Sequence, residues 1–208
     1  MLNRGFTLIE VLVTLVILTF GLLGIAGLMA KGQRASFEAF QRQQAISIAS
    51  DIAERIRANR KQTAAYVAAA PLGTPVGQGN QYNGLLDAAI TDCGTYTCTT
   101  AQLAAYDIAL WDGLLLGYSE AQVAGGAKVG GIVNARGCVA QTADTSGTCP
   151  PAPSPSVPYT LTVRVSVAWE GNEDTLVPTS STCGQGVYSA ETRRRVVVLD
   201  MMVLQSCP

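Results

Sequence analysis

The residue types that could carry chemistry in this 208-residue chain are carboxylates, cysteines and arginines, because the sequence contains no histidine. Without histidine, neither a Ser/His nor a Cys/His dyad can form. Asp107 and Asp112 are five residues apart and share a helix face poorly, and Asp87 and Asp92 lie in an expected loop. We therefore predict that the chain is not an enzyme, has no catalytic residues and uses no cofactor.

The six cysteines all follow the apolar N-terminal segment: Cys93, Cys98, Cys138, Cys149, Cys183 and Cys207. An even number confined to one part of the chain is typical of three disulfides formed in an oxidising compartment. Structural zinc is the alternative, but paired C-x2-C motifs are missing, and we expect no metal. Many pairings are possible. We predict bridges between sequence neighbours across loops, Cys93–Cys98, Cys138–Cys149 and Cys183–Cys207.

One carboxylate, Glu10, lies at the start of a long apolar segment. Val11 to Ala30 are 20 uncharged, mostly apolar residues, about the length that crosses a bilayer core as a helix. A carboxylate in hydrocarbon costs roughly 2–3 kcal/mol, so we expect a group outside this chain to compensate it. A secretory signal peptide would be cut after its apolar region, but Leu28 is too bulky for the cleavage site that ends at Ala30. A plain signal anchor explains the span but not Glu10.

Helical periodicity continues beyond this segment. Residues 33–60 contain no proline, and apolar residues recur on one helix face at Ala45, Ile48, Ala49, Ile52, Ala53 and Ile56. We expect one helix with a transmembrane part over residues 6–30 and an amphipathic continuation over 31–60. Gly21, Gly24 and Gly27 either allow close packing against other helices or let the helix loosen locally.

The remaining residues, 61–208, are expected to form a disulfide-bonded head. A capping box at Thr99–Gln102 predicts a helix over about 100–116. Alternation of apolar and polar residues predicts strands over 159–170 and 195–204, and a third strand with a glycine bulge over 128–139. Loop composition is found over 71–84 and 141–158. The predicted fold class is α+β, with a long N-terminal helix packed on a small antiparallel β-sheet.

Charge in the head argues against nucleic acid as a partner. Residues 62–208 carry six basic and 11 acidic side chains, so the head lacks a basic footprint. The one basic cluster, Arg193 to Arg195, would point its side chains to both faces of a strand, which favours a solvated strand end that protects a sheet edge. Trp111 and Trp169 are expected in the core rather than in a binding platform.

The sequence RGFTLIE, residues 4–10, resembles the signature of type IV pilins and of the related pseudopilins of type II secretion. The resemblance implies that a prepilin peptidase removes the leader, residues 1–5, by cutting after Gly5, and that the new amino terminus at Phe6 is methylated. It also implies that Glu10 pairs with the amine of a neighbouring subunit and sets the register between subunits.

Longer stretches are similar to the minor pilin family called type IV pilus modification protein PilV. They include GLLGIAGLMAKGQRASFEAFQRQQAISIASDIAERIRANR, CGTYTC, AQLAAYDIALWDGLL and YTLTVRVSVAWEG. The resemblance implies the pilin "ladle" fold and a low-copy subunit of the pilus, or of its tip or priming complex, that promotes pilus assembly. A type II secretion pseudopilin and a pilus-tip subunit that acts as an adhesin or captures DNA are the alternatives.

The partners that this resemblance implies are the prepilin peptidase, other major and minor pilins, the inner-membrane assembly platform and membrane lipid. The expected location is the inner membrane, with a single span, a cytoplasmic N-terminus and a periplasmic head. From there the subunit would pass into a pilus on the cell surface.

Overall fold

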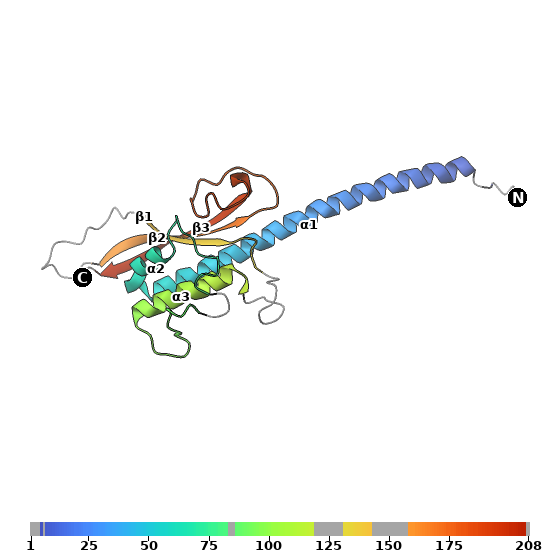
Figure 1. Ribbon diagram of the computed structural model, residues 1–208. Helices are drawn as coiled ribbons and strands as arrows, with labels where there is room; N and C mark the ends of the chain where they lie inside the picture. Colours follow the sequence, from blue (N-terminus) through green and yellow to red (C-terminus); the bar gives the residue numbers. More distant parts are fainter. Residues whose placement is uncertain (1–4, 6, 83–85, 119–130, 143–157, 207–208) are drawn as a thin grey trace. The chain divides into compact units, whose positions relative to one another are not determined.

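The N-terminal segment forms one long helix. The computed structural model describes residue 5 and residues 7–82, 86–118, 131–142 and 158–206, and helix α1 runs over Leu8–Ala58 (Figure 1). The chain divides into two compact units, residues 1–40 and 41–208, and each is described here by itself. After α1 come two short elements that the sequence pattern did not predict, the 3-10 helix η1 (Arg60–Gln62) and helix α2 (Thr63–Ala69).

The head contains a three-stranded antiparallel sheet in the order β1-β2-β3. The strands are β1 (Arg136–Thr142), β2 (Pro158–Glu170) and β3 (Arg194–Ser206). The central strand β2 pairs Ala168 with Arg136 of β1 and Glu170 with Arg194 of β3, and both ladders continue without interruption from these pairs. Successive strands are therefore neighbours, as in a meander.

Helices cover one face of this sheet. The core joins the part of α1 that follows Gln41, α2 and helix α3 (Thr100–Leu115) to the odd-numbered residues of β2, among them Val163, Val165 and Val167 (Figure 1). The buried stripe of α1 contains all six apolar residues that the helical periodicity singled out. Trp111 and Trp169 are buried in this core, as expected. The fold is α+β, a long helix packed on a small antiparallel sheet.

The predicted elements match the structure unevenly. The expected helix over 100–116 corresponds to α3, whose capping box is formed by Thr99 and Gln102, and the expected strands over 159–170 and 195–204 correspond to β2 and β3. The expected strand over 128–139 is misplaced, because β1 begins only at Arg136 and continues to Thr142.

Backbone conformation explains why β1 begins late. Gly131 and Asn134 have φ values of 101° and 53°, in the left-handed region that interrupts an extended strand. Gly137 does not form the expected bulge. A Cβ atom there would lie 2.5 Å from the Trp111 ring, so glycine allows α3 to approach the strand closely. Residues 119–130 and 143–157 lie outside the described part of the chain.

The disulfides are partly as predicted. The Cys93–Cys98 bridge is confirmed, but Cys138 pairs with Cys183, so both Cys138–Cys149 and Cys183–Cys207 are wrong. The reason is that the segment after β2 folds back over the second face of the sheet, where Cys138, Ala168, Cys183 and Tyr188 form a small buried cluster. Cys149 and Cys207 lie outside the described residues.

We predict that non-reducing peptide mapping of the full-length protein will link Cys93 to Cys98 and Cys138 to Cys183. Replacing both members of the second pair by serine should cost about 4 kcal/mol of unfolding free energy, because that bridge closes a loop with a sequence separation of 45. The same change at Cys93 and Cys98, separated by 5 residues, should cost about 2 kcal/mol. A peptide that joins Cys138 to Cys149 would contradict the assignment.

Candidate functional site

Glu10 lies in the first turn of α1. The carbonyl of Thr7 accepts hydrogen bonds from the amides of Glu10 (3.1 Å) and Val11 (3.3 Å). The partial positive charge at a helix N-terminus favours a carboxylate in this turn. Its side chain is exposed, as is Gly5, where an added Cβ would have no neighbour within 4 Å. Packing within this chain therefore does not require glycine at position 5. Phe6 lies outside the described residues.

The side chains around Glu10 form an apolar surface. Leu8, Ile9, Leu12 and Leu15 are exposed, as are further large apolar residues up to Met29. Among the described residues, α1 is the one helix long and apolar enough to cross a membrane. Exposure of so many large apolar side chains marks a surface that is covered by lipid or by other protein.

The few polar side chains in this segment are satisfied within the helix. The hydroxyl of Thr14 donates to the carbonyl of Val11 (2.9 Å), and that of Thr19 donates to the carbonyl of Val16 (2.8 Å). Such bonds make threonine compatible with hydrocarbon. A Cβ added at Gly21, Gly24 or Gly27 meets nothing within 4 Å. Contacts inside this chain therefore do not require glycine at these positions, and they support neither close helix packing nor local loosening of the helix. Glu10 remains the one acidic residue of the apolar segment.

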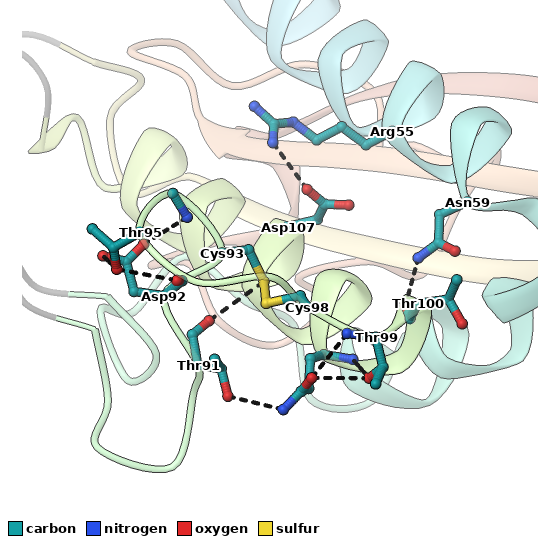
Figure 2. Close-up of a disulfide and its surroundings, with 12 residues drawn as sticks. Arg55, Asn59, Thr91, Asp92, Cys93, Thr95, Cys98, Thr99, Thr100 and Asp107 are labelled. Carbon is teal, nitrogen blue, oxygen red and sulfur yellow. Dashed lines mark hydrogen bonds and ion pairs between the residues drawn. A yellow bond between two sulfur atoms is a disulfide. The ribbon is translucent and has the colours of Figure 1, made fainter.

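In the head, Asp107 of α3 contacts α1 through Arg55 (Figure 2) and α2 through Tyr66. Its carboxylate accepts from Arg55 of α1 (3.0 Å) and from the hydroxyl of Tyr66 in α2 (2.6 Å). Burial, followed by the bond to Asp107, raises the pKa of Tyr66. Asn59 completes the junction by donating to the carbonyl of Thr100 (2.7 Å). These side chains hydrogen-bond to one another and to the backbone, so their role is to hold the helices together rather than to present a reactive group.

The Cys93–Cys98 bridge closes a short loop directly before α3 (Figure 2). Thr99 follows the bridge as the N-cap, and the side chain of Gln102 both accepts from the Thr99 amide (2.9 Å) and donates to Thr91 (3.2 Å). The bridge and the capping box therefore fix the start of α3 together. Within this loop Tyr96 is exposed.

Asp112 organises the loop between α2 and α3. Its carboxylate is buried, with 1% of the residue exposed. It accepts hydrogen bonds from five backbone amides, those of Gly77 (2.5 Å), Gln78 (3.0 Å), Gly79 (3.3 Å), Gln81 (2.9 Å) and Tyr82 (3.3 Å). Gly77 and Gly79 adopt positive φ values of 106° and 75°, which direct successive amides to one side, as in an anion-binding nest. The nest is filled by a carboxylate of the same chain.

The arginine cluster at the start of β3 has a different role from the one predicted. Arg194 is only 2% exposed, and it donates to Glu191 (2.7 Å) and to the carbonyls of Pro178 (3.0 Å), Ser181 (2.8 Å) and Cys183 (3.3 Å). A bond from the Gly186 amide, followed by the bond from Arg194, lowers the pKa of Glu191. A solvated strand end is therefore wrong for Arg194, because its guanidinium holds the segment that carries Cys183.

The two flanking arginines bind the same segment. Arg193 forms an ion pair with Asp174 (3.5 Å), and Arg195 donates to the carbonyl of Glu173 (2.6 Å) and to the Thr175 hydroxyl (2.7 Å). The cluster thus connects β3 to the segment after β2 instead of forming a basic patch. For Asp112, the sequence signal that could have identified its role was the glycines around position 78. For the arginines, it was the acidic residues at 173, 174 and 191.

Two family matches cover the first half of the chain. Residues 28–109 match the family described as Type IV pilin Tt1218, and residues 1–26 match the prokaryotic N-terminal methylation motif. No curated protein and no solved structure is significantly similar to the chain.

For the head we predict that Asp112→Asn, although isosteric, lowers the unfolding free energy by about 2 kcal/mol or more, because the new amide NH2 faces N–H donors and leaves buried amides unsatisfied. Asp87→Asn is the control. Asp87 is exposed and accepts a single amide bond from Ala89 (2.8 Å), which an amide oxygen can replace, so a change within about 0.5 kcal/mol is expected. Urea unfolding followed by fluorescence of the buried tryptophans measures both. Equal losses for the two variants would contradict the role of Asp112.

Proposed function

We propose that this type IV pilin is a minor subunit that enters the pilus, or its tip or priming complex, at low copy and promotes assembly. The matched N-terminal motif implies processing by a prepilin peptidase and assembly with other pilins. The observation that carries the proposal is the position of Glu10, the one acidic residue on an exposed apolar helix surface that begins directly after Gly5 and Phe6. Similarity of its longer motifs to PilV-type minor pilins supports the low-copy role.

Membrane location follows from the same surface. Before assembly the apolar part of α1 would be covered by lipid, with the short N-terminal leader in the cytoplasm and the disulfide-bonded head in the periplasm. The two described disulfides support a head on the oxidising side of the membrane. In the pilus, the same apolar surface would be covered by the helices of neighbouring subunits.

Glu10 would act through a charge pair between subunits. Cleavage after Gly5 creates an amine at Phe6, and a carboxylate on a neighbouring helix can pair with it in surroundings of low dielectric. Misplacing the helix along the filament axis would leave both charges unpaired, which is costly when they are buried. The pair would therefore select one register for an incoming subunit.

Capture of DNA receives little support from the head. Arg194 is buried, and Arg193 and Arg195 are engaged by residues of the segment after β2. The methylation motif resembles that of secretion pseudopilins as well, so a direct test of presence in pili separates the pilus role from the secretion role. The amount of the subunit in sheared pili provides that test.

Processing is tested by mass spectrometry of the native N-terminus. We expect the mature chain to begin with N-methylated Phe6, because a peptidase subsite that excludes side chains requires Gly5. Gly5→Leu should abolish cleavage while the head keeps both described disulfides. An intact Met1 in the wild-type protein, or cleavage after Ala30, would contradict the pilin-type processing.

For Glu10→Ala we expect normal membrane insertion, cleavage and head folding, since removal of a carboxylate lowers the transfer cost of the helix. Its amount in sheared pili, relative to the membrane pool, should fall at least about tenfold, because an unpaired buried amine costs several kcal/mol. Thr14→Val is the matched control, because the Thr14 hydroxyl bonds to its own helix. Wild-type amounts of a processed Glu10→Ala subunit in pili would show that Glu10 does not set the register.

A further inference from the structure

The ladder register determines which backbone groups of β3 face away from the sheet. Gly137 exchanges backbone bonds with Val76, which lies outside the sheet (2.9 and 3.0 Å). Odd-numbered residues of β1 therefore point their backbone groups outward, and the even-numbered residues of β2 bond to β1. In an antiparallel ladder these directions alternate, so the odd-numbered residues of β2 bond to the odd-numbered residues of β3. The bond from the Gly171 amide to the Arg193 carbonyl (2.8 Å) follows the same parity.

The even-numbered residues of β3 consequently direct their amides and carbonyls to the outer edge. In the middle of the strand these residues are Val196, Val198, Asp200, Met202 and Leu204. The other edge of the sheet is covered, because Val76 and Ala70 bond to Gly137 and Val139 of β1. For β3 from Val196 to Leu204, no backbone bond from this edge reaches another described residue. Among the described residues the sheet thus has one covered edge and one open edge.

The open edge also has apolar surroundings. A groove of about 300 Å³ lies between β3 and α1. It is lined by Ile46, Ala49, Ser50 and Arg42 of the helix and by Val196 to Leu199 of the strand. Farther along β3, Met202 is 76% exposed and Leu204 is 57% exposed. Devices that protect edges, such as proline, lysine or a bulge, are missing from this strand.

We propose that the outer edge of β3 is a docking site for an extended segment of another pilin-type subunit, which adds to the sheet as a fourth strand. Only another extended backbone offers alternating donors and acceptors at the spacing of the outward groups. The proposal rests on the pilus role proposed above, because it takes the partner from the proteins that assemble with this chain.

Charge favours a different subunit over a second copy of this chain. Asp200, the one acidic residue of β3, is already bound by Nε and Nη2 of Arg164 (2.7 and 2.8 Å), and this interaction lowers the pKa of Asp200. Arg42 at the groove makes no ion pair with a described residue. A second copy that paired through its own β3 would bring no available carboxylate to Arg42, whereas an apolar strand that carries an acidic side chain would complement it.

The small area of such a contact indicates that the pairing would form between subunits anchored in the same membrane. A single strand laid along one edge is a small interface, at or below the roughly 1,200 Å² that stable complexes between free proteins bury. Anchoring both subunits in one membrane raises their effective concentration and makes a small contact sufficient. At Gly137 and Val139 the other edge is already paired, so a second strand cannot add there.

The test measures hydrogen exchange at single-residue resolution in the full-length protein. One sample is native membrane from cells that contain the other pilins, and the other is the purified protein in detergent. The amides of Val198 and Met202 should exchange at least about tenfold more slowly in the membrane sample. The amides of Leu199 and Met201, which bond to β2, should be protected in both. Equal exchange of the outward amides in the two samples would overturn the proposal.

A matched pair of variants separates strand addition from other contacts. Met202→Pro removes an outward amide that has no partner in the sheet, a substitution that edge strands accept, and it should abolish the gain in protection at Val198. Met202→Val keeps the amide and should preserve that gain. Both variants should retain protection at Leu199. A gain in protection that survives in the proline variant would overturn the proposal.

The partner is identified by a photoreactive amino acid at position 202 of the full-length chain. The captured protein should begin with a processed pilin N-terminus, and Arg42→Glu should reduce its capture while Arg42→Lys preserves it. A second copy of this chain, or a protein without such an N-terminus, would overturn the assignment. Cleavage after Gly5 and presence in pili are scored in the same cells. A processed subunit in pili with unprotected β3 amides overturns strand addition alone, whereas an unprocessed subunit absent from pili overturns the proposed function.

Discussion

The single helix α1 has to be compatible with hydrocarbon in its first part and with the protein core of the head in its second part. The rest of the structure depends on this constraint. The regular backbone hydrogen bonds of α1 are made within the helix, which is the condition for placing a chain in hydrocarbon. Its large apolar side chains are exposed up to Met29, whereas most of those after Gln41 lie in one buried stripe, with Ile46 as an exposed exception. The head is assembled on that stripe, with Ile52 and Ile56 in the same core as Trp111 and Val165.

Charged residues in the head mainly hold backbone in place. Asp112 accepts hydrogen bonds from five amides of the loop between α2 and α3, and Arg194 donates to three carbonyls of the segment after β2. Each replaces the regular secondary structure that these segments lack, since buried backbone groups need partners. Asp107 instead binds side chains, those of Arg55 and Tyr66, at the junction of three helices. Some of the acidic residues of the head therefore stabilise its interior, and others lie on its surface.

Local patterns predicted the elements well, and contacts distant in sequence explain the failures. Alternation identified β2 because each apolar residue faces one core, and Thr99 with Gln102 identified the start of α3 because a capping box is local. The partner of Cys138 depends on how residues after β2 return over the sheet, which no spacing of cysteines records. The burial of Arg194 has the same origin. In the N-terminal segment, Glu10 was conspicuous because a lone carboxylate interrupts an apolar run.

The meander order of the sheet has a consequence for the timing of export. A chain that emerges from a membrane N-terminus first presents the α1 stripe early, but the core that covers this stripe includes Met201 and Val203, near the opposite end of the chain. Cys138 likewise cannot form its disulfide before Cys183 is available. If the head is exported as proposed, it closes only after nearly all of the polypeptide has been translocated. Until then, Ile48 and Ile52 would have to be covered by lipid or by a chaperone.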